Sequence, residues 1–221
     1  VILVANGLLL FDGWFGLLFS WFAIVWMLNL YNFMDGMDGF SGGMTLFGFG
    51  FLALAGWLQG ADVYALFSAV IAFASLGFMC VNFPPAKLFM GDVGSASLGL
   101  LAAGFSLWGI QQQLFEWWFP LTIFSPFIVD ATVTLVHRIL KRERIWEAHR
   151  SHYYQRLVQL GWGHKKTVLA EYLLMLLVGA SALVALQLDE LFITTCLLLM
   201  WAVGYFLIAW WIHRSTLGSG S

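Results

Sequence analysis

Residues 191–212 read LFITTCLLLMWAVGYFLIAWWI, a run of 22 residues without a charged side chain. Such a run can cross a bilayer, because a transmembrane helix needs about 20 apolar residues. The whole chain has this character: 61% of its 221 residues are hydrophobic and 10% are charged, whereas soluble domains carry about 25% charged residues. The sequence therefore excludes a soluble globule and predicts an all-α, polytopic integral membrane protein.

Similar apolar runs predict seven transmembrane helices in a single transmembrane domain that covers residues 1–217. The expected spans are about 14–31, 43–59, 63–81, 94–110, 115–137, 167–187 and 191–212. A polar segment, residues 138–166, forms the longest connection. The chain begins at Val1 without a methionine, and residues 218–221 read as a linker scar. We therefore expect an N-terminally truncated fragment of a longer protein.

The basic residues all fall on one side of the membrane if the spans alternate in direction. Every Lys and Arg lies in residues 32–42, 82–93, 138–166 or 213–221. The connections on the opposite side contain acidic residues but no Lys or Arg. The positive-inside rule makes the basic side cytoplasmic. The formal net charge is −2, so no broad positive field indicates nucleic acid as a partner.

The first polar motif, NLYNFMDGMDG, occupies residues 29–39 at the cytoplasmic end of the first span. If this segment is helical, Asn29 and Asn32 share a face, and so do Asp35 and Asp38. Gly36 allows a ligand to approach the backbone closely. A helix end capped by Asn and Asp is the structural alternative.

The second motif surrounds Asp92, within the sequence NFPPAKLFMGDVGS of residues 82–95. Asp92 is either the N-cap of the following helix or a metal ligand, and the two roles can coexist. Phe89 is either a membrane-interface residue or a surface on which a base can stack. Lys87 is a candidate for phosphate oxygens.

The third motif, HRSHYYQRL, occupies residues 149–157 in the polar connection. His149 and His152 could share a helical face, and Arg150 offers a forked donor for phosphate; a solvated basic loop near lipid headgroups is the alternative. Asp130 precedes Arg138 by eight residues, about 12 Å into the membrane at about 1.5 Å per residue. An acid at that depth is a functional candidate, although pairing with a Thr or a basic neighbour is equally open.

Carboxylates, glycines, histidines and arginines thus gather at one cytoplasmic mouth. Mg²⁺ in proteins is commonly held by one or two carboxylates together with substrate phosphates. The residues alone therefore predict a site for a Mg²⁺-bound, phosphate-rich substrate.

The three motifs, NLYNFMDGMDG, FMGDVGS (89–95) and HRSHYYQRL, resemble those of the polyprenyl-phosphate N-acetylhexosamine-1-phosphate transferases, glycosyltransferase family 4. Members are integral membrane enzymes that transfer a sugar 1-phosphate from a UDP-sugar to undecaprenyl phosphate and release UMP. The resemblance implies Mg²⁺, with Mn²⁺ as a substitute, and metal ligation by Asp92 with Asn32 and Asp35.

The same resemblance assigns roles to the remaining motif residues. Phe89 and the turn from Gly36 to Asp38 are expected near the uracil, and the His149, Arg150 and His152 loop is expected to close over the nucleotide sugar. Asp130 resembles the acid of the family's Pro-x-x-x-Asp stretch. The expected catalytic residues are Asp35, Asp38, Asp92, His149 and His152, and the expected substrate-binding residues are Asn29, Asn32, Gly36, Lys87, Phe89, Asp130 and Arg150.

Two departures from the family pattern refine these expectations. The family has an adjacent Asp-Asp pair that this chain lacks; we expect the pair upstream of Val1 and expect this fragment alone to be inactive. The His-Arg-Ser-His sequence replaces three consecutive histidines of the branch that transfers phospho-MurNAc-pentapeptide. This difference favours the branch that initiates O-antigen or related surface glycans, with a GlcNAc-, QuiNAc- or FucNAc-type sugar.

The expected location is the bacterial inner (plasma) membrane, with the active site on the cytoplasmic face. The expected partners are a UDP-N-acetylhexosamine-type sugar, undecaprenyl phosphate and membrane lipid, and a homodimer is left open. The alternatives are the pentapeptide transferase of peptidoglycan synthesis, an inactive fragment, and a membrane transporter, which would need polar groups on both faces.

Overall fold

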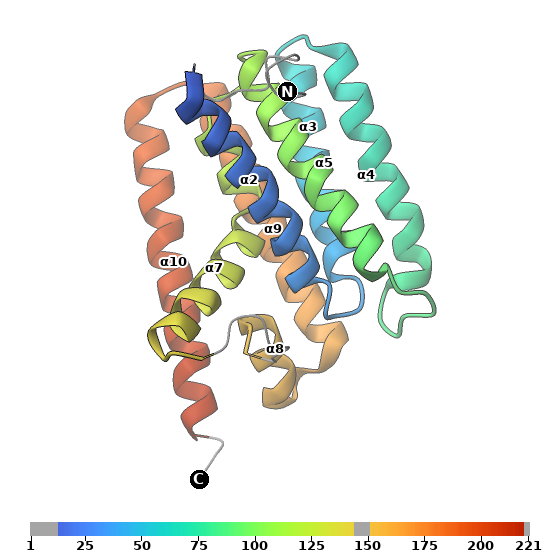
Figure 1. Cartoon of the computed structure of the whole chain (residues 1–221), viewed down its shortest axis with the longest axis vertical. Coiled ribbons are helices and arrows are strands. Elements are labelled where there is room, and N and C mark those ends of the chain that lie inside the picture. Colours follow the sequence, from blue (N-terminus) through green and yellow to red (C-terminus); the bar gives the residue numbers. More distant parts are fainter. Residues whose placement is uncertain (1–12, 144–150, 219–221) are drawn as a thin grey trace.

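The computed structural model describes residues 13–143 and 151–218, and this part of the chain is helical without a strand. Six of its helices are long and apolar enough to span a membrane, and they form one bundle (Figure 1). They are α2 (Gly13–Met34), α3 (Phe40–Leu58), α4 (Asp62–Asn82), α5 (Gly91–Gln111), α9 (Gly163–Leu188) and α10 (Leu191–Gly218). The expected all-α, polytopic architecture is therefore confirmed.

The span predicted at residues 115–137 is two helices rather than one. Helix α6 (Trp118–Ile123) ends at Ile123, and Phe124 separates it from α7 (Ser125–Leu140). Pro126 lies in the first turn of α7. Proline lacks a backbone N–H and its ring collides with the carbonyl four residues earlier, so a helix cannot continue unbroken through it. Helix α7 consequently crosses the lower part of the bundle obliquely (Figure 1).

The polar connection after α7 also contains helical structure. A short helix, α8 (Tyr153–Leu157), runs into a π-helical turn, η1 (Val158–Trp162), and then into α9. Gly161 and Gly163 adopt φ values of 90° and 68°, which residues with a side chain rarely adopt. These two glycines let the chain reverse between α8 and α9, so that the third motif lies beside the start of α9.

Helix α3 lies inside the bundle, in contact with α4, α5 and α9. Its glycines allow close approach: a Cβ at Gly43 would collide with the ring of Tyr172, and one at Gly48 with the ring of Phe124. Small residues at helix contacts are common in membrane proteins, where packing rather than water exclusion holds helices together. The outer faces of α4 and α10 expose large apolar side chains, as expected of surfaces in contact with lipid.

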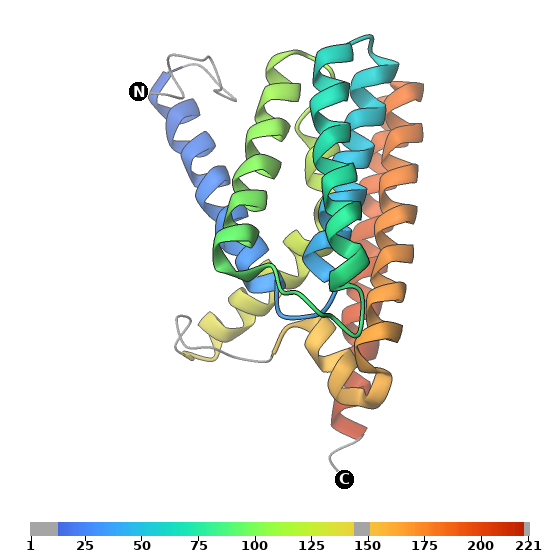
Figure 2. The same ribbon diagram turned by 90° about the vertical axis from the view of Figure 1, so that its right-hand side faces the viewer.

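The two ends of the bundle differ in charge. The 35–39 turn, the 83–90 loop, α8 and the start of α9 meet at one end (Figure 2), which also carries the Lys and Arg side chains of the described residues. We call this the basic end. The opposite end has a hollow of about 1020 Å³ whose lining includes Glu116, Asp189 and Glu190. Acidic side chains therefore line a cavity at the end opposite to the basic end.

Candidate active site

The first and second motifs meet where α2 ends and α5 begins. Asn32, in α2, donates hydrogen bonds from Nδ2 to Oδ1 of Asp92 (3.1 Å) and to Oγ of Ser95 (3.3 Å). Asp92 is the second residue of α5 and not its N-cap, which is Met90. The first turn of a helix has backbone N–H groups without helical partners, and it favours negative charge. An exposed carboxylate is thus oriented by an amide that lies 60 residues away in the sequence.

Asp35 lies directly after α2 and is half-buried. Burial, together with the negative charge of Asp92, raises the pKa of Asp35 to about 6. The two carboxylates therefore lie close enough to repel each other, and a divalent cation between them would remove that repulsion.

Oxygen donors of this kind suit Mg²⁺. The described residues contain no group of three or more His, Cys, Asp and Glu that could hold a metal ion. Asp92, Asp35 and Asn32 together offer two carboxylates and an amide oxygen, a donor set compatible with Mg²⁺ only if further ligands come from outside the described residues.

The 35–39 turn is fastened to two other helices. The backbone N–H of Gly39 donates to Oδ1 of Asn82 in α4 (2.9 Å), and its carbonyl accepts a hydrogen bond from the hydroxyl of Tyr172 in α9 (2.6 Å). Gly39 adopts φ 76°, in the left-handed region that favours glycine. The turn is not helical, so the predicted helical face shared by Asp35 and Asp38 is wrong.

Asp38 is held by groups from two further segments. Its Oδ2 accepts a hydrogen bond from the backbone N–H of Ala86 (3.1 Å) and lies 3.4 Å from Nδ1 of His164 in α9. The side chain of Asp38 is 17% exposed and that of His164 45%. The first motif, the 83–90 loop and the start of α9 therefore meet at one carboxylate.

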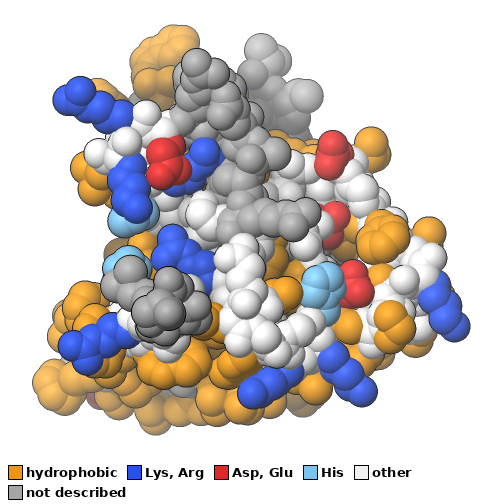
Figure 3. All heavy atoms as spheres, turned by 90° about the horizontal axis from the view of Figure 1, so that it is seen from below, with side chains coloured by type: hydrophobic (Ala, Val, Ile, Leu, Met, Phe, Trp, Pro, Cys, Tyr) orange, Lys and Arg blue, Asp and Glu red, His pale blue; other side chains and the backbone are white. Residues whose placement is uncertain are grey.

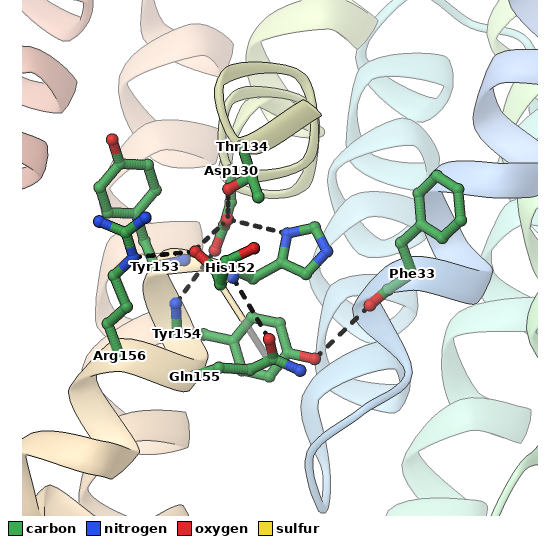
Figure 4. Close-up of polar contacts among 9 residues, drawn as sticks. Phe33, Asp130, Thr134, His152, Tyr153, Tyr154, Gln155 and Arg156 are labelled. Atoms are coloured by element: carbon green, nitrogen blue, oxygen red, sulfur yellow. Dashed lines mark hydrogen bonds and ion pairs between the residues drawn. The ribbon is translucent and has the colours of Figure 1, made fainter. Parts of the chain in front are cut away.

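The third motif is attached to α7 through Asp130. The carboxylate of Asp130 accepts hydrogen bonds from the backbone N–H groups of Tyr153 (2.9 Å) and Tyr154 (3.1 Å) and from the hydroxyl of Thr134 (3.1 Å). Nδ1 of His152 lies 3.2 Å from Oδ1 of the same carboxylate (Figure 4). Of the alternatives for Asp130, pairing with a Thr and a basic neighbour is the one the structure contains.

His152 has an extended backbone conformation, φ −60° and ψ 149°, and it precedes α8 as its N-cap. The predicted helical face shared by His149 and His152 is therefore wrong at His152. Its ring is buried and stacks at 6.5 Å from the ring of Phe33 in α2.

The third motif also touches the first motif. The hydroxyl of Tyr154 donates a hydrogen bond to the backbone carbonyl of Phe33 (3.5 Å), and a Cβ added at Gly36 would collide with that hydroxyl. Tyr154 is buried and its ring packs on that of Phe40 (4.8 Å between centroids). Segments more than a hundred residues apart are thereby held at the basic end.

Three further predicted residues, Asn29, Lys87 and Phe89, make no side-chain hydrogen bond, ion pair or ring contact with the other motif residues that the structure describes. Asn29 donates its side-chain hydrogen bond to the carbonyl of Val25 in its own helix and is exposed. Phe89 is 72% exposed and Lys87 is also exposed, both in the loop before α5. His149 and Arg150 lie outside the described residues.

The basic end is charged around its rim. Figure 3 shows Lys and Arg side chains distributed around this face, with acidic and histidine side chains between them. Such a surface suits an anionic ligand whose charge is shared between a metal ion and basic side chains.

Residues of this site that are absent from the sequence-based list include Asn82, His164 and Tyr172. Each lies in the last or first turns of an apolar span, where a polar side chain reaches the interface. A polar residue at the end of an apolar span and next to a motif could have indicated such a residue in the sequence. Asn82 fits this description, because it ends one span and begins the second motif. Nothing in the sequence indicated that the start of α9 packs against the 35–39 turn.

The chain was compared with proteins of known family. Residues 2–110 match the profile of glycosyl transferase family 4. The chain is 34% identical over 174 residues to the probable undecaprenyl-phosphate N-acetylglucosaminyl 1-phosphate transferase of Bacillus subtilis, a match covering 78% of this chain and 49% of that protein.

Pentapeptide transferases are similar to a comparable degree. The phospho-N-acetylmuramoyl-pentapeptide-transferase of Staphylococcus saprophyticus is 32% identical over 169 residues (73% of this chain, 50% of that protein). That of Oceanobacillus iheyensis is 33% identical over 183 residues (80% of this chain, 54% of that protein). The chain spans about half the length of the curated relatives it matches. Together with the three motifs at one end of a helical membrane bundle, these matches establish that the chain belongs to glycosyl transferase family 4.

Proposed function

We propose that this chain carries the metal and nucleotide-sugar site of an enzyme that transfers an N-acetylhexosamine-type sugar 1-phosphate from a UDP-sugar to undecaprenyl phosphate and releases UMP. The observation that carries the proposal is the convergence of Asn32, Asp35 and Asp92 from two helix ends. The name of the Bacillus subtilis relative supports the lipid acceptor and the type of sugar.

Asp92, Asp35 and Asn32 would hold a Mg²⁺ ion, which supplies neutralisation of the diphosphate charge when bound. In the reaction, a phosphate oxygen of the lipid attacks the phosphorus that bears the sugar. The bond from this phosphorus to the bridging oxygen breaks, and UMP leaves with that oxygen. Positioning of the two phosphates by this chain's residues is then the main source of acceleration.

The 35–39 turn would contact the uridine part of the donor. Asn82, Tyr172 and His164 hold this turn from two sides, so it is preorganised and need not be ordered when the ligand binds. Lys87 and Arg150 are proposed to contact phosphate oxygens, and the exposed ring of Phe89 is proposed to stack on the base.

One observation favours the surface-glycan branch over the pentapeptide branch. The third motif is His-Arg-Ser-His instead of three consecutive histidines. By the positive-inside rule, we propose that the basic end faces the cytoplasm in a bacterial inner membrane.

The test uses the full chain in nanodiscs. Radiolabelled UDP-N-acetylglucosamine and undecaprenyl phosphate are supplied with Mg²⁺ or with Mn²⁺. Lipid-linked product, released UMP and metal-dependent binding of the donor are measured. We expect metal-dependent donor binding, which Asp92→Asn abolishes and the matched Asp62→Asn change at the opposite end preserves.

The outcomes separate the alternatives. Lipid-linked product supports the complete reaction, and binding without turnover supports the site together with the expectation of an inactive fragment. Equal affinity for UDP-MurNAc-pentapeptide would support the pentapeptide branch. Donor uptake into vesicles would support a transporter, and absence of metal-dependent binding would refute the proposal.

A further inference from the structure

The carboxylate of Asp130 is surrounded by hydrogen-bond donors. Oδ1 accepts from the hydroxyl of Thr134 and the backbone N–H of Tyr153 and lies 3.2 Å from Nδ1 of His152, while Oδ2 accepts from the backbone N–H of Tyr154. An ionised carboxylate offers about four lone-pair positions. Three of the four groups meet at Oδ1 and one at Oδ2, so the carboxylate is held mainly by contacts with the third motif and with its own helix.

Two of these donors are backbone N–H groups of the first turn of α8. An isolated helix of five residues is not stable in water, since nucleation costs more than so few hydrogen bonds return. Asp130 satisfies the N–H groups that open this helix. The carboxylate thus attaches α8 to α7, a longer helix that is packed in the bundle.

The contact with His152 also determines the state of the imidazole ring. Because a carboxylate only accepts hydrogen bonds, a neutral His152 ring carries its proton on Nδ1 and its lone pair on Nε2. The ring lies between Asp130 and Phe33 (Figure 4). Its orientation and its tautomer therefore both depend on Asp130.

We propose that Asp130 is a positioning residue that acts on the site through His152, the N-cap of α8, and does not itself contact the substrate. The ring of His152 in turn stacks on the ring of Phe33 in the first motif. This assignment replaces the expectation that Asp130 binds substrate. The expected effect of Asp130 on donor binding rests on the proposed function above.

The first arm of the test reads the ring state without any substrate. Histidine is labelled with ¹⁵N in the full chain, and His152 is assigned by its loss in His152→Ala. We expect an Nδ1–H tautomer in the wild-type chain. Asp130→Asn should move the proton to Nε2, because an amide can donate to Nδ1. The control is Thr132→Val on the same helix, whose hydroxyl is buried without a hydrogen-bond partner.

The second arm measures donor affinity in the presence of Mn²⁺ for Asp130→Asn, His152→Ala and the double variant. Loss of hydrogen bonds to a charged group corresponds to about a 10- to 100-fold change. We expect each single variant to bind UDP-N-acetylglucosamine at least about tenfold more weakly, and the double variant to bind no more weakly than His152→Ala. Thermal unfolding of each variant identifies losses caused by misfolding.

The outcomes distinguish the two proposals. An additive double variant, or an affinity loss in Asp130→Asn while His152→Ala binds normally, would show that Asp130 acts independently of His152 and would overturn the inference. An unchanged tautomer in folded Asp130→Asn would also overturn it. Absence of donor binding by the wild-type chain would count against the proposed function alone. The measured tautomer of His152 in the wild-type chain and in Asp130→Asn would then test whether Asp130 positions the ring.

Discussion

At the scale of single residues, the aspartates at the basic end have different environments. Asp92 is exposed, and its carboxylate is oriented by the side-chain amide of Asn32. Asp35 is half-buried, and its burial is the main cause that raises its pKa to about 6. Asp38 is paired with His164, and Asp130 is occupied by four donors. The four aspartates therefore differ in their contacts, although they look alike in the sequence.

Gly36 provides a residue-scale prediction. A Cβ at this position would collide with the hydroxyl of Tyr154, so Gly36→Ala should lower the free energy of unfolding by about 1–3 kcal/mol, as overpacking does. Adding Tyr154→Phe should restore part of the loss by removing the colliding atom. The matched control is Gly77→Ala in α4, where no atom lies within 4 Å of the new Cβ and a helical alanine should be neutral or stabilising. Equal effects at both glycines would contradict the close contact.

His164 provides a second prediction at this scale. Because it is 45% exposed, its pairing with Asp38 contributes at most about 1 kcal/mol. His164→Ala should therefore leave the unfolding free energy nearly unchanged and weaken donor binding by up to about fivefold. The exposed His213 at the same end, changed to Ala, is the control in the same titration calorimetry. A large fall in stability with unchanged affinity would show that the pair is structural only.

At the scale of elements, the site is assembled from helix ends. The end of α2, the end of α4 and the start of α5 supply the first two motifs, and the start of α9 closes the turn between them. Helix ends carry backbone groups without helical partners, so polar side chains and anions gather there. The break between α6 and α7 tilts α7, which brings Asp130 to the third motif.

The attachment of α7 to α10 can be tested by a double-mutant cycle. Ser125, the first residue of α7, shares a hydrogen bond of 2.7 Å with the hydroxyl of Tyr205 in α10. Ser125→Ala and Tyr205→Phe should each lower the unfolding free energy by about 1 kcal/mol. The double variant should cost little more than one single variant, since both remove the same bond. Strict additivity in denaturant titrations would exclude a shared hydrogen bond.

At the scale of the whole molecule, charge separates the two ends of the bundle. Lys and Arg side chains of the described residues lie with the three motifs, and the opposite end carries acidic residues and a separate hollow. By the positive-inside rule, this asymmetry predicts the orientation of the protein in the membrane, and it gives the face with the candidate site the charge that attracts anionic ligands.

The orientation can be measured by cysteine labelling. In a background with Cys80 and Cys196 replaced by Ala, Lys141→Cys reports on the basic end and Glu190→Cys on the opposite end. A membrane-impermeant maleimide should label Glu190→Cys in intact spheroplasts and Lys141→Cys only in inverted vesicles. The reverse pattern would place the basic end outside the cytoplasm and would contradict a site supplied with cytoplasmic UDP-sugar.

The sequence alone determined the class of the protein and the separation of charge between the two ends of the bundle. These properties depend on the cost of placing charge in hydrocarbon, which is read directly from composition. The family also followed from sequence, because the three motifs are local patterns, and the profile match confirms it.

Only the tertiary structure decided how the motif residues are divided among roles. The pairing of Asp38 with His164 and the attachment of Asp130 to His152 join groups from different segments. Hydropathy places each helix across the membrane but does not specify which helices are neighbours or how they are rotated. Those choices come from side-chain packing between segments distant in the chain.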